Sequence, residues 1–483
     1  MSGQSILPQA QRQRHPVPIW IYFLGWLLAL PLLTGPDTGL ALIGMLVVSV
    51  LPTLLWRTGE APTLVWVATY QWFQAFVGII QAAMVGVSVD NYFGGENFAQ
   101  STLLSLLGVL FLAVGMKLGR RAITPSRTEV TTQAFAALRP ERLFMVWLVF
   151  SLSEGSVDIF LWGSGLAIIV QPIFYTFIAA MLLLFQRTLI TRNGRSWSIV
   201  MFATQVLVGF VGYFAGFKLA FFVLILAVLT FSDVHRRYWI SGACVLAIVV
   251  LLGSFWQGIK FEYRQFLNGG EEAQVVRVSI PERVRFISEA LQFVEWNTLI
   301  SGLDEVFNRV GYVTIFGHCV GNVPQNVPHS KGRLWKEAVA HVFMPRLLFP
   351  GKMEFNDSDR TNEFSGTRVA DASQGTSIGI GYCGESYIDF GIPVMFIPIL
   401  TFGVLIGIAY GLMVRMAPHP VFGAALGCSL IMRCNIDLAS SNAKMLGALV
   451  SSLLIYAIIL RLAGKPIWRW LCPPAAKSER PRI

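Results

Sequence analysis

The sequence predicts an all-α polytopic membrane protein with about 12 transmembrane helices and one large, mainly helical loop. Of its 483 residues, 54% are hydrophobic and only 13% are charged, which is far from the composition of soluble globular domains. Apolar runs long enough to cross about 30 Å of hydrocarbon as helices recur from end to end. Only between residues 257 and 390 does this pattern stop, for 134 residues.

Twelve apolar segments are expected to span the membrane. They cover residues 18–33, 40–56, 62–87, 103–116, 143–152, 166–185, 198–214, 219–231, 238–256, 392–414, 421–432 and 445–462. The fifth is short and ends in SLSEGSVD, which is also typical of a half-span or an interfacial helix. The polar, basic opening segment has no small-residue cleavage site after the first apolar run, so we expect a retained anchor rather than a cleaved signal peptide.

The distribution of basic residues orients the bundle. Outside residues 257–390 there are 24 Lys and Arg, and 21 of them fall on the side of the N-terminus. By the positive-inside rule this side is the cytoplasm, so we expect both termini to be cytoplasmic and the protein to lie in the bacterial inner membrane. The loop is then periplasmic. It carries 13 basic and 16 acidic residues, so the net charge of +10 belongs to the membrane part and does not indicate nucleic-acid binding.

We therefore divide the chain into four parts. These are an N-terminal bundle of about nine spans (1–256), a periplasmic loop with the candidate active site (257–390), a C-terminal bundle of about three spans (391–465) and a cytoplasmic tail (466–483). In the loop, Ser279 and Glu282 form a capping box that predicts one amphipathic helix. A second helix is expected from 333 to 344, with Glu337 and His341 on its polar face.

Basic residues suggest an anion site at the outer surface. Lys218 lies in the very short outer connection GYFAGFK, where it either snorkels to the interface or meets an anionic head group. The loop adds Lys260, Arg264, Arg309, Arg346, Lys352 and Arg368. Each alone is typical of a solvated face. Several together would hold a diphosphate, because Arg binds phosphate oxygens bidentately and Lys supplies a point charge.

Acidic and histidine side chains are the candidates for proton transfer. Glu385 and Asp389 lie four residues apart where the loop re-enters the membrane, and so on one face of a helix that begins there. One of them would serve as general base for a sugar hydroxyl, or both would serve as helix caps. His341 is either a second base or phosphate partner, or an ordinary surface histidine.

Other patterns point away from metal and cofactor chemistry. The glycines of residues 379–384 match the dinucleotide fingerprint in form, but without a strand, turn and helix around them we reject it. No metal-ligand spacing occurs on the outer side, so we expect no metal and no cofactor. Cys319 and Cys383 share the loop, and the sequence leaves a disulfide between them open.

The order of motifs carries a family resemblance. GYFAGFK is followed by EYR after a later span, and then by a loop with VPQNVPHSKG, FMPRLLFPGK and TSIGIGYCGESYIDFG. Over about residues 211–394 the chain resembles the bacterial oligosaccharide repeat-unit polymerases, the O-antigen and exopolysaccharide polymerases (Wzy-type). The architecture is similar to that of GT-C-like polymerases and ligases. Such proteins join undecaprenyl-diphosphate-linked oligosaccharides into longer chains at the periplasmic face.

The resemblance implies roles for individual residues. Lys218, Arg264 and Arg346 would bind the donor diphosphate, and Glu385 would match the acidic residue before the aromatic-Phe-Gly step. Lys218 departs from the commoner Arg. The implied partners are the lipid-linked oligosaccharide and membrane lipid, with a chain-length regulator and a flippase of the same pathway. Transfer would need no nucleotide sugar and no metal, and we expect inversion at the anomeric carbon.

Three other functions fit parts of the sequence. An O-antigen ligase uses the same donor but a different acceptor, lipid A core. A lipid-linked oligosaccharide flippase or polysaccharide exporter would carry charges at mid-membrane depth, where these helices have few. A non-catalytic scaffold of a polysaccharide-synthesis complex would tolerate loss of the loop arginines.

Overall fold

The computed structural model describes residues 17–124, 132–161, 166–191, 193–211, 216–231, 236–270, 277–344, 349, 356–369 and 377–473. Over these ranges all regular secondary structure is helical, without a strand. The predicted all-α class is therefore confirmed.

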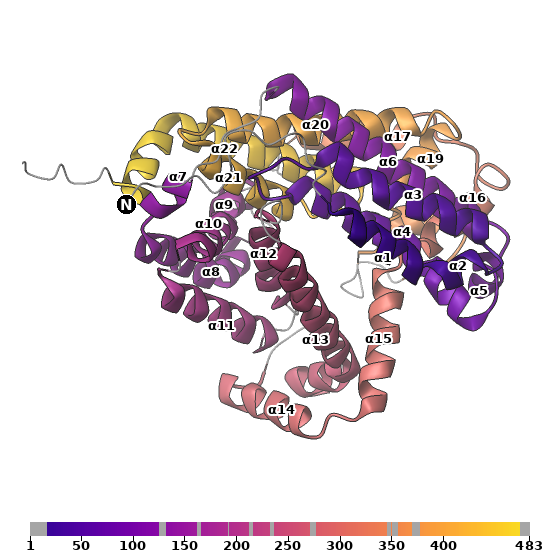
Figure 1. Ribbon diagram of the computed structural model, residues 1–483. Coiled ribbons are helices and arrows are strands. Elements are labelled where there is room, and N and C mark those ends of the chain that lie inside the picture. Colours follow the sequence, from indigo (N-terminus) through magenta and orange to yellow (C-terminus); the bar gives the residue numbers. More distant parts are fainter. Residues whose placement is uncertain are drawn as a thin grey trace, which may run out of the picture.

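Figure 1 shows the helices in their spatial arrangement. In chain order they are α1 (Ile19–Leu28), α2 (Leu30–Leu33), α3 (Thr38–Leu55), α4 (Thr63–Val85), α5 (Val89–Phe93), α6 (Phe98–Ile123), α7 (Thr132–Ala137), α8 (Pro140–Leu161), α9 (Ala167–Phe174), α10 (Thr176–Thr191), α11 (Arg195–Val211), α12 (Lys218–Leu229), α13 (Arg236–Asn268), α14 (Ile280–Gln292), α15 (Trp296–Val310), α16 (Thr314–Asn322), α17 (Arg333–Phe343), α18 (Asp357–Ser365), α19 (Tyr382–Phe390), α20 (Phe396–Met416), α21 (Pro420–Arg433) and α22 (Asn442–Leu471).

Seven helical segments among the described residues are long and apolar enough to cross a membrane. They are α3, α4, α6, the α9–α10 pair, α13, α20 and α22, and α1, α12 and α21 are shorter apolar helices. Helices overlap all twelve apolar segments that the sequence predicts as spans. Seven of those segments have both the length and the composition of a membrane helix.

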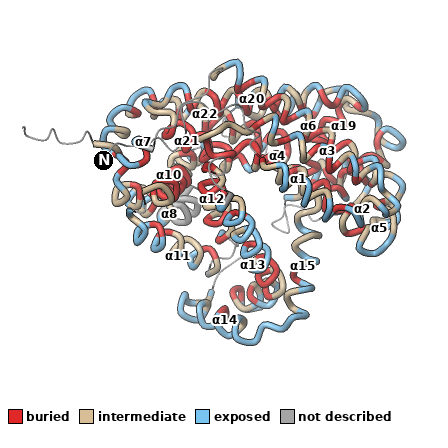
Figure 2. The backbone as a smooth tube through the Cα atoms, viewed as in Figure 1, coloured by how far each residue is buried: buried red, intermediate tan, exposed pale blue. Residues whose placement is uncertain are grey.

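Apolar side chains lie exposed on the outer faces of several of these helices (Figure 2). On α13, Ile248 is 46% and Leu251 is 56% exposed, and on α11, Leu207 is 63% exposed. Such surfaces are unfavourable in water, whereas contact with lipid tails carries no such cost. The pattern is that of helices facing hydrocarbon.

The most extensive helix contact among the described residues is the crossing of α6 and α20. A methyl group added at Gly115 of α6 would overlap the carbonyl oxygen of Leu400, and one at Gly407 of α20 would overlap that of Met116. Gly403 meets α6 in the same way, at Leu112. Small residues four apart let two backbones touch, which is how apolar helices associate in lipid.

The segment after α13 differs from the sequence prediction at its start. We expected the loop to begin at residue 257, but α13 continues to Asn268. The added residues are mostly good helix formers, and the helix ends only where Gly269 and Gly270 adopt φ values of 68° and 86°. With α14 and α15, the end of α13 forms an arm below the main body in Figure 1.

The two helices predicted inside the loop are confirmed. α14 begins at the predicted capping box, in which the backbone N–H of Ser279 donates to Glu282 Oε2 at 3.0 Å. α17 covers Arg333–Phe343, within one residue of the expected range. Together with α16, α18 and α19 it packs against α6 and α22 at the right-hand end of the molecule in Figure 1.

We predict that Gly407→Ala destabilises the bundle by about 1–3 kcal/mol, because its methyl group would force α20 away from α6. The measurement is thermal unfolding in detergent, followed by size-exclusion chromatography. Gly447→Ala is the matched control: Gly447 also lies in an apolar helix, but an added methyl group there meets nothing within 4 Å. This control should be neutral or stabilising by up to about 1 kcal/mol. Equal effects of the two substitutions would contradict the prediction.

Candidate functional site

Four basic side chains come together where α12, α13 and α15 meet. They are Lys218 at the start of α12, Lys260 and Arg264 on α13, and Arg309 in the last turn of α15. Lys260 interacts electrostatically with Arg309, Arg264 and Lys218, and Lys218 also interacts electrostatically with Arg309. Lys218, Lys260 and Arg264 are half-buried and Arg309 is exposed. We call these four residues the basic cluster.

The continuation of α13 creates one half of this cluster. Because the helix runs on to Asn268, Lys260 and Arg264 lie one turn apart on the same face. Close packing brings in α15. A methyl group added at Gly302 of α15 would overlap the carbonyl oxygen of Ser254 on α13, and one at Gly258 would lie 2.7 Å from the carbonyl oxygen of Thr298.

Aromatic packing places Lys218 beside the same stretch of α13. The ring of Phe217 stacks on Phe210 with centroids 4.0 Å apart and contacts Trp256 of α13 at 6.4 Å. Trp256 in turn packs against Tyr263 at 5.4 Å. Phe217 and Tyr263 are fully buried, so apolar contacts fix the start of α12 against α13. Lys218, the next residue after Phe217, is thereby held beside α13.

The basic cluster is only partly offset by acidic side chains. The carboxylate of Glu305 interacts electrostatically with Lys260. Arg309 and Asp437 both interact with the half-buried Tyr70 of α4, with opposite effects. Cations at this spacing repel one another. An anion that contacts several of them would therefore be bound favourably.

A second group of polar side chains is centred on Glu385 of α19, which is 1% exposed. Its Oε2 accepts a hydrogen bond of 2.9 Å from the backbone N–H of Asn442, and its Oε1 lies 3.7 Å from Arg360 Nη1. Burial raises the pKa of Glu385 to about 8, against the opposing effects of the Asn442 bond and the Arg360 charge. Burial therefore favours the protonated form of this carboxyl group, and the Arg360 charge favours the ionised form.

Ion pairs join Glu385 to the surrounding helices. Arg360 of α18 also pairs with Glu337 of α17, and Asp357 of α18 pairs with Lys444 of α22 at 2.6 Å. Asp357 is 3% exposed, so the carboxylate of this ion pair is buried. The contacts tie α17, α18, α19 and α22 into one unit.

Asp389 has a structural role. Its Oδ1 accepts from Ser330 Oγ at 2.6 Å and from the backbone N–H of Leu334 at 3.0 Å, and its Oδ2 accepts from the backbone N–H of Trp335 at 2.8 Å. It therefore caps the first turn of α17. Asp389 lies four residues after Glu385, but the two carboxyl groups bind different helices: Asp389 binds the start of α17 and Glu385 binds the start of α22.

Asp437, in the turn between α21 and α22, is the acidic residue that the sequence analysis missed. It acts on Tyr70 together with Arg309, and on Tyr312 together with Glu385 and Asp357. It thus links the basic cluster with the Glu385 group. Burial raises its pKa, and its Oδ1 is buried without a hydrogen-bond partner among the described residues. A carboxylate in the short turn NIDLASSN between two apolar helices was the available signal.

The structure brings together some of the predicted site residues and not others. Lys218, Arg264 and Arg309 converge, joined by Lys260, whereas Arg346 and Lys352 lie outside the described residues.

His341 lies half-buried in the last turn of α17, one turn beyond Glu337. Cys319 and Cys383 are both buried, free thiols, so the disulfide left open by the sequence is not formed.

We predict that Glu385 makes the protein less stable as the pH rises from about 4.5 to about 8. The folded state keeps the proton up to the higher value while the unfolded chain loses it at the lower one, so folding is favoured most below this window. Glu385→Gln mimics the protonated form and should flatten the fall in unfolding temperature across that range. Glu363→Gln, at an exposed partner of Arg333, is the matched control. An unchanged slope in Glu385→Gln would show that the buried group is ionised throughout.

Comparison with known proteins gives a family without an assigned function. Residues 76–438 match the family described as "Domain of unknown function (DUF8712)". No curated protein and no solved structure matches the chain. The matched range contains the basic cluster, Glu385 and Asp437, and covers 363 of the 483 residues. The chain therefore belongs to the DUF8712 family.

Proposed function

We propose that the protein polymerises undecaprenyl-diphosphate-linked oligosaccharide repeat units into O-antigen or exopolysaccharide. The observation that carries this proposal is the basic cluster, in which Lys218, Lys260, Arg264 and Arg309 converge beside apolar helices. Guanidinium groups bind phosphate oxygens in pairs, and ammonium groups add point charges. A lipid diphosphate would place its head group on the cluster and its chain in the surrounding lipid.

The proposal includes a topology. The chain would cross the bacterial inner membrane twelve times with both termini in the cytoplasm, in a GT-C-like arrangement. Residues 257–390 would then lie in the periplasm, where the lipid-linked glycans are joined. A chain-length regulator and a flippase of the same pathway would be its partners.

The reaction would be a displacement at the anomeric carbon of the donor glycan. The acceptor hydroxyl oxygen forms the new C–O bond as the bond to the lipid diphosphate breaks, and the diphosphate leaves with the electron pair. The basic cluster would stabilise the charge that develops on this leaving group. A carboxylate would take the proton of the acceptor hydroxyl.

Asp437 is better placed than Glu385 for that proton. Its charge acts in the same surroundings as Arg309, and its Oδ1 has no partner among the described residues. Its raised pKa makes it a stronger base than an exposed aspartate. Glu385 is buried and bonded to Asn442 at the start of α22, the helix that follows Asp437. We therefore assign Glu385 a positioning role.

We predict that purified protein in liposomes converts a synthetic undecaprenyl-diphosphate oligosaccharide into a ladder of repeats without a nucleotide sugar. The readout is gel electrophoresis of the glycan. Arg264→Ala and Asp437→Asn should each lower the rate by about 10²–10³-fold, because each removes a group that acts in the transition state. Arg285→Ala is the matched control: this arginine is exposed and pairs with Glu289 of its own helix.

Other outcomes would replace the proposal. A single transfer onto lipid A core would identify a ligase, and substrate crossing the bilayer without a ladder would identify a transporter. A full ladder from Arg264→Ala would remove the basic cluster from the reaction. Loss of polymer in cells, without any activity of the purified protein, would favour a scaffold.

A further inference from the structure

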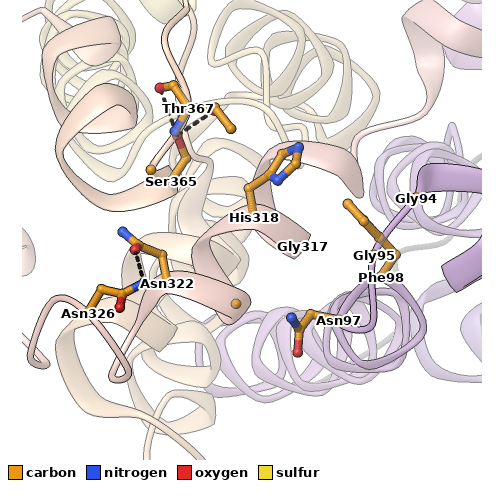
Figure 3. Close-up of a pocket in the computed structure, with 12 residues that line it drawn as sticks. Gly94, Gly95, Asn97, Phe98, Gly317, His318, Asn322, Asn326, Ser365 and Thr367 are labelled. Carbon is orange, nitrogen blue, oxygen red and sulfur yellow. Dashed lines mark hydrogen bonds between the residues drawn. The ribbon is translucent and has the colours of Figure 1, made fainter.

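A pocket of about 300 Å³ opens where three distant segments of the chain meet (Figure 3). They are the turn between α5 and α6, the exposed face and end of α16, and the residues that follow α18. The pocket lies apart from the Glu385 group. α16 directly follows α15, so Arg309 of the basic cluster and His318 of the pocket lie on consecutive helices.

The lining of the pocket is polar but carries no formal charge. Its side chains are amides, hydroxyls, one histidine and the ring of Phe98, and none of the described lining residues is Asp, Glu, Lys or Arg. Most small-molecule pockets are chiefly apolar. A phosphate, a carboxylate or an ammonium group would find no counter-charge here, so the lining selects an uncharged polar ligand.

Several hydrogen-bonding groups in the pocket remain available to a ligand. The side-chain amide of Asn97 and the ring nitrogens of His318 make no hydrogen bond to the described protein; the His318 ring only packs edge-on against Phe98, with centroids 5.3 Å apart. Asn326 donates to Asn322 Oδ1 at 3.0 Å, which leaves its own carbonyl oxygen to accept. The wall therefore offers a ligand both donors and acceptors.

Asn322 and the Ser365–Thr367 pair hold the wall in place. Asn322 donates to the carbonyl oxygen of Phe364 at 2.9 Å, which fastens α16 to the end of α18. The hydroxyl groups of Ser365 and Thr367 lie 2.8 Å apart and bond to each other. The lining is thus largely organised before any ligand arrives, which lowers the entropic cost of binding.

Glycines bring backbone to the pocket surface. An added methyl group at Gly317 would overlap the ring of Phe98, and one at Gly321 would lie 2.7 Å from Asn97 Nδ2. Glycine at position 317 therefore lets α16 pack closely on the start of α6, whereas at position 321 the Asn97 side chain can rotate away. Gly366 has φ of 68°, a conformation that favours glycine.

We propose that this pocket binds one neutral sugar ring. A sugar carries several hydroxyl groups, each both donor and acceptor, and amide, imidazole and hydroxyl side chains match them without a net charge. The volume is at the lower end of the about 300–1,000 Å³ range of ligand pockets, which suits a single ring rather than a chain. The inference that the pocket binds a sugar rests on the pocket's own chemistry. The further statement that this sugar belongs to a lipid-linked glycan rests on the proposed function.

The test is direct binding to the detergent-purified full-length protein by saturation-transfer NMR. The probes are free glucose, galactose, rhamnose and N-acetylglucosamine, with glycerol as the reference polyol. We expect at least one sugar to bind more tightly than glycerol, and Asn97→Ala and His318→Ala each to weaken it about tenfold. Asn91→Ala is the matched control, since Asn91 is an exposed amide on the adjacent helix α5 that does not line the pocket.

Each result bears on the pocket separately from the proposed reaction. Equal binding by the wild type and both variants, or no sugar bound above glycerol, would overturn the proposal. If one variant elutes as aggregate, the other still decides. The protein could bind sugar in an Asn97-dependent way and still make no glycan ladder. That result would support the sugar-binding pocket and contradict the proposed polymerase activity. A ladder from a protein that binds no free sugar would do the reverse.

Discussion

The backbone contact between α6 and α20 is the constraint on which the remaining structure depends. At Gly115, Gly403 and Gly407 no side chain separates the two helices, so their crossing is fixed by the main chain itself. α3, α4, α16 and α19 pack on α6, and α21 and α22 pack on α20. The start of α6 supplies Asn97 and Phe98 to the pocket, while α22 supplies the backbone N–H that Glu385 binds. The contact between α6 and α20 thus positions both the pocket and the Glu385 group.

In the basic cluster, helix packing holds like charges close together although they repel one another. Lys218, Lys260, Arg264 and Arg309 repel one another, and the carboxylate of Glu305 opposes that repulsion at Lys260. The rigid contacts of Gly258 and Gly302 between α13 and α15 hold the charges at this spacing. Such an arrangement costs stability in the unbound protein and is relieved by an anion, which is the usual sign of a binding site rather than of a stabilising ion pair.

Local patterns predicted most of the helices, because each depends on a few neighbouring residues. The capping box at Ser279 and the periodicity of 333–344 are of this kind. What the sequence could not predict depends on contacts between distant segments. The convergence of Arg309 with Lys218 needs the crossing of α13 and α15, and the role of Asp389 needs α17 to start beside it. Asp437 becomes notable only because it and Arg309 both interact electrostatically with Tyr70. The pocket, built from residues near 97, 321 and 366, leaves no periodic signal at all.

The two polar regions complement each other chemically. The basic cluster has an excess of positive charge at the edge of an apolar bundle, whereas the pocket around His318 has hydrogen-bonding groups and no charge. A ligand with an anionic head group joined to a neutral, hydroxyl-rich part would satisfy both regions, and a simple phospholipid or a free sugar would satisfy only one. If one molecule engaged both, its affinity would reflect the sum of two modest interactions joined by a short link. Selectivity for the intact conjugate would then follow from the separation of charge and neutral polarity on consecutive helices, without a large apolar pocket.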